Sequence, residues 1–125
     1  MKLKTAGNVL LQIVMEMDAY DTVLAAINAG HIVSACSIDE EGVADALFKM
    51  ASGDGLGIRL NMEYSLEELF RGEVGELLVE CTPEGADEVF KTTLAKVLGI
   101  VTEEAGIVYR NTVISIDEAL NNKYS

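Results

Sequence analysis

The chain has 125 residues, of which nine are basic and 21 acidic, giving a formal net charge of −12. This length suits a single domain over residues 1–125, and the hydrophobic half of its composition argues against disorder. The negative charge repels phosphate backbones, which argues against nucleic acid as a partner. The longest apolar stretch, 8–17, is too short to span a membrane, and nothing resembles a signal peptide, so we expect no membrane partner.

The first part of the chain predicts strands alternating with helices. Residues 8–16 have the pattern of a strand, followed by a helix that Asp18 or Asp21 caps and Gly30 ends. The inward face predicted for this helix consists of Tyr20, Val23, Leu24 and Ile27. Residues 31–37 are apolar or small throughout, which predicts a central strand covered on both faces.

A helix over 40–52 and a strand over 56–62 follow. Ser65 and Glu68 have the spacing of a capping box, which opens a short helix ending near Phe70. A strand at 75–81 then leads to a helix with Pro83 at its first position. Its predicted inward face consists of Ala86, Val89, Phe90, Leu94 and Val97. The remaining predicted elements are two or three short strands, at 99–102, 106–110 and 112–116, and a last turn of helix from Asp117.

This order predicts an α/β (α+β) fold in which helices pack on a mixed sheet. The two cysteines, Cys36 and Cys81, lack the spacing of a zinc or redox motif, so we expect buried free thiols in a reducing cytoplasm. His31 is the single histidine, and no partner for it is evident. We therefore assign no catalytic residue and no metal ligand.

Two glycine-containing segments could bind phosphate. Residues 53–57 (GDGLG) follow a helix and precede a strand, the reverse of a phosphate loop, which indicates a tight connection. Residues 37–42 have the right polarity, since a strand runs through them into a helix whose first N–H groups attract anions. The acidic residues Asp39, Glu40 and Glu41 either cap this helix themselves or hold Mg²⁺ for a nucleotide, and the sequence leaves both open.

Three segments resemble phosphoribosylformylglycinamidine synthase, specifically its aminoimidazole ribonucleotide synthetase-type C-terminal half-domain. Residues 30–51 (GHIVSACSIDEEGVADALFKMA) are similar to the family's V-S-A-H-D-x-S-D-G-G-L-A-x-A-L-A-x-M-A pattern. Residues 53–57, Leu69-Phe70 and 75–80 (GELLVE) resemble its G-N-G-x-G, L-F and G-x-F-L-V-E-V elements, and 98–103 (LGIVTE) its closing strand. The N-terminal 3–8 (LKTAGN) is similar to the lead-in of this half-domain in long single-chain synthases.

The resemblance implies a three-layer sandwich, partly ferredoxin-like, from an enzyme that converts formylglycinamide ribonucleotide to its amidine with ATP, Mg²⁺ and glutamine-derived ammonia. It implies phosphate or substrate binding at Ser37, Asp39 and Gly42. The family's histidine, first aspartate and first glycine are here Cys36, Ser37 and Glu41, and a glutamate obstructs a phosphate that a glycine admits.

We therefore expect a half-domain excised from a longer synthase chain, structural or degenerate, and inactive without its parent, with no cofactor of its own. The resemblance implies the remaining synthase domains and a glutaminase domain as partners, and exposed docking surfaces would allow a homodimer. The alternatives are a freestanding ferredoxin-like module that binds a small ligand and a domain of another ATP-using relative, such as a selenophosphate synthetase-like or thiamine phosphate kinase-like protein.

Overall fold

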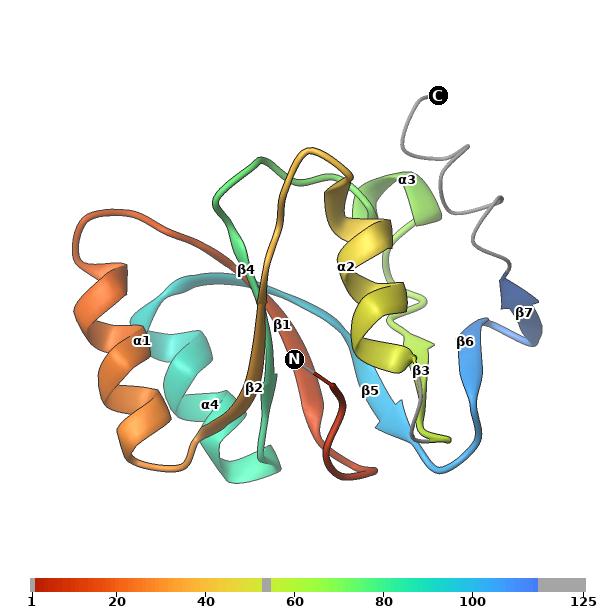
Figure 1. The fold of residues 1–125 in the computed structure, drawn as a ribbon, viewed down its shortest axis with the longest axis horizontal. Coiled ribbons are helices and arrows are strands. Elements are labelled where there is room, and N and C mark those ends of the chain that lie inside the picture. The colour runs from red at the N-terminus through yellow and green to blue at the C-terminus, as the bar shows by residue number, and fades with distance from the viewer. Residues whose placement is uncertain (1, 53–54, 115–125) are drawn as a thin grey trace.

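The structure is a computed structural model and describes residues 2–52 and 55–114 (Figure 1). The strands are β1 Val9–Val14, β2 Ile32–Ser37, β3 Gly57–Leu60, β4 Leu77–Cys81, β5 Leu94–Thr102, β6 Gly106–Tyr109 and β7 Thr112–Ile114. The helices are α1 Ala19–Asn28, α2 Gly42–Ala51, α3 Leu66–Leu69 and α4 Pro83–Thr92. The helical turn predicted from Asp117 and the end of the strand predicted at 112–116 lie outside the described residues.

All seven strands form one mixed sheet in the order β2-β4-β1-β5-β3-β6-β7. Among the described strands, β3 and β6 are the one parallel pair, and the other neighbours are antiparallel. The elements β1-α1-β2 and β4-α4-β5 make a four-stranded ferredoxin-like unit, and α2, β3 and α3 are inserted between its halves. The predicted fold class, a mixed sheet with packed helices that is partly ferredoxin-like, is confirmed.

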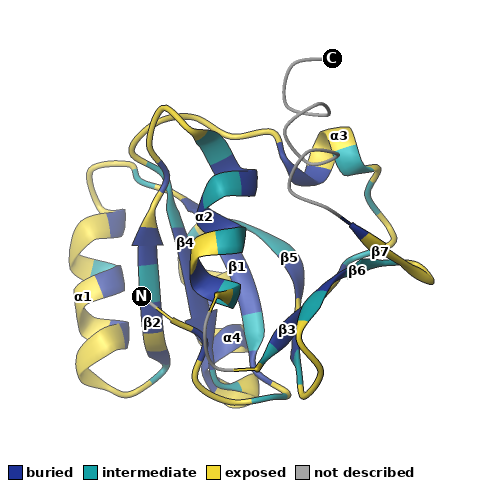
Figure 2. Ribbon diagram, turned by 45° about the vertical axis from the view of Figure 1, so that its right-hand side comes forward, coloured by how far each residue is buried: buried dark blue, intermediate teal, exposed yellow. Residues whose placement is uncertain are grey.

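Helices cover both faces of the sheet, which gives three layers. Figure 1 shows α1 and α4 on one face, while α2 crosses the other. Each face has its own core: Leu11, Ile13 and Val79 lie under α1 and α4, and Leu10, Leu78 and Leu98 lie in the cluster that contains the α2 side chains. The buried stripe of α2 shows as dark bands in Figure 2. No helix in the described part of the chain is both long and apolar enough to cross a membrane.

A buried carboxylate fixes the segment that leads into β1. Glu80 is 0% exposed, and its carboxylate oxygens accept hydrogen bonds from the Lys4 and Thr5 amides and from Asn8 Nδ2 at 2.9 to 3.1 Å. Four hydrogen bonds compensate for the cost of burying this polar group. The N-terminal segment is therefore part of the folded core.

Three local predictions are wrong. The strand at 31–37, β2, is covered on both faces, with Cys36 in one core and Ile32 in the other, but it lies at the edge of the sheet and not at its centre. The sheet order depends on the long-range pairing of β1 with β4 and β5, which local spacing does not encode.

The predicted face of α1 is also wrong, because Tyr20, Leu24 and Ile27 are exposed while Val23 is buried. The buried residues of α1 are Ala19, Val23 and Ala26, since α4 packs close to a small-residue face. The third error concerns α4, whose predicted inward face included Phe90 and continued through Leu94 and Val97. Phe90 is 50% exposed. Helix α4 ends at Thr92, and Leu94 and Val97 belong to β5.

Candidate phosphate site at the turn between β2 and α2

The turn after β2 is attached to the loop that precedes β4. The Ile38 amide donates to the Glu76 carbonyl at 2.8 Å, and the Gly75 amide donates to the Ile38 carbonyl at 2.9 Å. The Ile38 side chain is 1% exposed and belongs to the core under α2. These contacts fix the point from which the chain turns into α2.

Within the turn, Asp39 bonds to the backbone that follows it. Its Oδ1 accepts from the Glu41 amide at 2.9 Å, and its carbonyl accepts from the Gly42 amide at 3.0 Å. Gly42 has φ of +90°, a conformation that strains any residue with a Cβ. The turn itself therefore explains the glycine, whether or not a phosphate ever approaches it.

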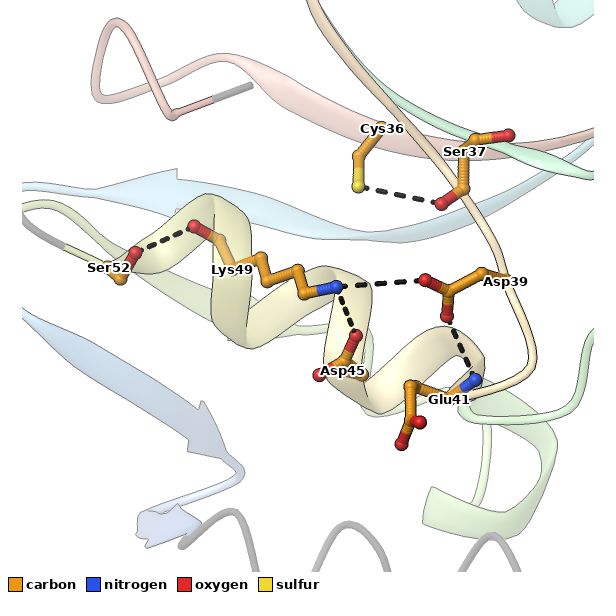
Figure 3. A network of polar contacts seen from close by, with 7 residues as sticks. All are labelled: Cys36, Ser37, Asp39, Glu41, Asp45, Lys49 and Ser52. Carbon is orange, nitrogen blue, oxygen red and sulfur yellow. Dashed lines mark hydrogen bonds and ion pairs between the residues drawn. The ribbon is translucent and has the colours of Figure 1, made fainter.

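Lys49 neutralises part of the acidic charge at this turn (Figure 3). Its Nζ lies 2.8 Å from Asp45 Oδ2 and 3.7 Å from Asp39 Oδ2. The hydrogen bond and charge of Asp45, with a further contribution from Asp39, raise the pKa of Lys49. Both Asp39 and Lys49 are about half exposed, so these ion pairs contribute little to stability.

The structure brings only part of the predicted site together. Asp39 and Gly42 share the turn, but Figure 3 shows the Ser37 hydroxyl pointing away from the Asp39 carboxylate. Glu41 occupies the N-cap position of α2 in a helical conformation, and its side chain makes no capping hydrogen bond. The sequence left open whether the acidic residues cap α2 themselves or hold Mg²⁺. The hydrogen bonds of Asp39 within the turn support the first interpretation, although Glu41 does not act as a cap.

Neither cysteine has the properties of a nucleophile. Cys36 and Cys81 are both free and buried. Burial raises the pKa of the Cys36 thiol, whose Sγ donates to the Ser37 carbonyl at 3.6 Å. Burial, with a smaller contribution from Glu80, raises the pKa of Cys81 to about 12. Both groups are therefore neutral thiols at physiological pH.

The residues of the turn fit Mg-ATP poorly. Asp39 already accepts from the Glu41 amide through one oxygen and pairs with Lys49 through the other. No group of three or more His, Cys, Asp and Glu side chains within residues 2–52 and 55–114 is arranged to hold a metal ion. We derive no chemical step through a nucleotide at this turn.

Sequence reasoning missed a second polar site, a groove of about 760 Å³ at the end of β1. Gln12 is 5% exposed, and its Nε2 donates to the Arg71 carbonyl at 3.0 Å and to Glu76 Oε1 at 2.8 Å. Lys96, opposite Gln12 on β5, donates through Nζ to the Glu68 carbonyl and also lines the groove. The sequence signal that could have indicated this groove is Gln12 itself, a glutamine within an otherwise apolar strand.

No family model matches the sequence. Solved structures with the same fold include PurLQS from Thermotoga maritima, with a TM-score of 0.70 and 17% identity over 91% of this chain and 25% of that chain. T. maritima PurL complexed with FGAR has a TM-score of 0.71 and 14% identity over 95% and 29% of the two chains. E. coli HypE, a hydrogenase maturation protein, has a TM-score of 0.67 and 15% identity over 92% and 51%.

At these identities the similarity establishes a shared fold. The chain spans between a quarter and about half of the length of these proteins. The fold that the sequence resemblance implied is therefore confirmed. HypE, which is not a purine synthase, shares the same fold.

Proposed function

We propose that this chain is the C-terminal half-domain of an ATP-dependent formylglycinamide ribonucleotide amidotransferase of purine biosynthesis, and that it is structural or degenerate and inactive alone. The observation that carries the proposal is the match of nearly the whole chain to T. maritima PurL complexed with FGAR, at a TM-score of 0.71. The order of the sequence segments that resemble the family gives independent support, because it is a property of the sequence alone.

The geometry of the β2–α2 turn supports the loss of ligand binding. Asp39 bonds to its own turn and to Lys49, and a glutamate stands at position 41 where the family pattern has a glycine. In the proposal, ATP and Mg²⁺ belong to the parent enzyme, and a solved structure of T. maritima PurL complexed with ATP supports this for ATP. The isolated domain needs no cofactor.

The proposal places the protein in the cytoplasm with the remaining synthase domains and a glutaminase domain that supplies ammonia. Apolar side chains such as Met17, Phe90 and Val113 are at least half exposed and are candidate contacts for these partners. Isolated from them, the domain would use the same surfaces to form a homodimer, which light scattering after size exclusion would detect.

Deleting the coding region tests the biological role. The proposal expects the deletion strain to require purines, and complementation with the intact region should restore growth without them. Normal growth on purine-free medium would exclude the amidotransferase function.

Calorimetric titration of the domain tests the proposed degeneracy of the turn. Neither Mg-ATP nor formylglycinamide ribonucleotide should bind with micromolar affinity. Glu41→Gly should gain affinity for one of them. Glu41→Gln removes the charge and keeps the size of the side chain, so it distinguishes charge repulsion of the ligand from steric obstruction. Micromolar binding to the unmodified turn would contradict degeneracy and leave the purine role intact.

A second candidate is a domain of another ATP-using relative, and the similarity to HypE favours it. The same deletion strain distinguishes the two. Loss of hydrogenase activity with normal purine synthesis would support the second candidate and reject the first.

A further inference from the structure

The groove beside β1 contains a buried acceptor with no partner. Gln12 Oε1 is buried and makes no hydrogen bond within the described part of the chain, although both Nε2 protons have acceptors. Exchanging the amide atoms would place Oε1 against the Arg71 carbonyl and Glu76 Oε1, two further acceptors, so the orientation is determined by the network. An unsatisfied buried acceptor is costly, which makes this one informative.

The surroundings of Gln12 combine acidic and apolar groups. Glu76 Oε1 accepts from Gln12 Nε2 and from the Glu73 amide, both at 2.8 Å, which fixes its carboxylate at the groove. Val14 and Leu94 form an apolar wall and are 39% and 58% exposed. Gln12 and Glu76 line the groove beside this apolar wall, a combination that suits a ligand that donates hydrogen bonds and carries a hydrocarbon chain.

The two cations of the groove have other partners. Lys96 Nζ donates to the Glu68 carbonyl at 2.6 Å and the Arg71 carbonyl at 3.3 Å, below α3. The Arg71 guanidinium lies 3.7 Å from the Glu67 carboxylate. The donors of both cations are therefore engaged by neighbouring acceptors, which leaves Gln12 Oε1 and the Glu76 carboxylate as the groups that can accept from a ligand.

We propose that this groove binds a small molecule with a primary ammonium group and a short apolar chain. The ammonium donates to Gln12 Oε1 and to the Glu76 carboxylate, and the chain lies against Val14 and Leu94. The backbone of Gly72 covers the amide so closely that an added Cβ would lie 2.5 Å from Gln12 Nε2. Binding therefore requires the segment at Gly72 to move outward, and its glycine permits this.

This site is independent of the proposed purine function, because neither Asp39 nor Gly42 takes part in it. Two kinds of molecule share the required chemistry, namely free amino acids and simple alkylamines. L-leucine and n-butylammonium represent these two kinds, and butyrate is the matched probe that lacks the ammonium.

Titration of the ¹⁵N-labelled chain followed by NMR tests the proposal. L-leucine, n-butylammonium or both should give saturable shifts at the amides of the groove below about 20 mM, and butyrate should not. Binding of L-leucine alone would identify a site for amino acids. Binding of both L-leucine and n-butylammonium would identify a site for amines in general. No saturable shifts with either ammonium probe, or equal shifts with butyrate, would overturn the proposal.

Two exposed leucines provide matched variants that should fold normally. Leu94→Lys places a positive charge in the groove and should weaken binding by about tenfold or more. Leu24→Lys makes the same change on α1, where Leu24 is 48% exposed, and should leave binding unchanged. Equal effects of the two variants would place the binding site elsewhere.

An isosteric pair of variants tests the role of the carboxylate. Glu76→Gln keeps an oxygen for the Gln12 and Glu73 donors and removes the charge, so the affinity should fall about tenfold. Glu84→Gln, in the first turn of α4, is the control. Unchanged affinity in a folded Glu76→Gln variant would exclude the proposed contact.

Discussion

The turns into α2 and α4 both join a strand to a helix of ten residues, but they begin the helix differently. Thr82 is extended, its Oγ1 accepts from the Gly85 amide at 3.0 Å, and Pro83 follows at the first helical position. Glu41 has helical dihedral angles and no capping bond from its side chain. Local sequence therefore defines the start of α4, whereas the start of α2 depends on the Asp39 turn and on the buried face of the helix.

The largest loss of stability should come from a substitution at Gly85, where α4 approaches His31, the residue before β2. A Cβ at this position would lie 2.6 Å from His31 Cβ and 2.7 Å from its Cα, so the helix or the strand would have to shift. We expect Gly85→Ala to lower the free energy of unfolding by about 2 kcal/mol in urea denaturation. Glu84→Ala next to it is exposed and should change little; an equal loss in both would show that the contact is unimportant.

Gly42→Ala should have the next largest effect. Its φ of +90° is costly for alanine, so we expect a loss of about 1.5 kcal/mol by the same measurement. Gly42→Asn should lose less, because asparagine tolerates positive φ better. If Gly42→Ala were fully stable, the backbone would not require the glycine, and access for a ligand would become the better explanation.

Substitutions at the N-cap residues, Thr82 of α4 and Glu41 of α2, should show the difference between the two turns directly as a difference in stability loss. Thr82→Ala removes the bond to the Gly85 amide and should cost about 1 kcal/mol, and Thr82→Ser should restore most of it. Glu41→Ala should stay within about 0.5 kcal/mol of the parent, because no capping bond is lost. A cost for Glu41→Ala as large as that for Thr82→Ala would remove the contrast between the turns.

The smallest effect should be that of Lys49→Met, which removes the ion pairs with Asp39 and Asp45. We expect a slight fall in Tm that disappears in about 1 M salt. Because the pKa of Lys49 is raised above 10.5 in the folded state, its contribution is complete below pH 10.5 and is lost as the pH rises through the folded-state value. A difference that persists at higher pH would point to packing of the lysine stem instead.

Predictions from the sequence were most accurate where a single residue type determines the local backbone geometry. Ser65 and Glu68 form the predicted capping box, with hydrogen bonds of 3.1 and 3.0 Å, and this lowers the pKa of Glu68 through the Ser65 amide. Pro83 stands at the first position of α4 as predicted. These features depend on neighbours within four residues, so they can be inferred without the rest of the fold.

Prediction failed where distant parts of the chain decide the outcome. Leu94 and Val97 continue the apolar spacing of α4, but the pairing of β1 with β5 places them in a strand. The groove at Gln12 joins β1, β5 and the loop before β4, which no local motif connects. At the β2–α2 turn, the spacing predicted that Asp39 and Gly42 lie between a strand and a helix, as they do, but gave no indication that Lys49 would reach back to the acidic groups.

The position of β1 between β4 and β5 also bears on how the protein is made. Its two neighbours, β4 and β5, are synthesised about 70 and 90 residues later, since Val9 pairs with Cys81 and with Ile100. A nascent chain at the ribosome therefore holds an apolar strand without its sheet partners until residues 77–102 have been made. Chaperone contact during synthesis should consequently concentrate on residues 9–14, and a chain released before residue 94 should aggregate.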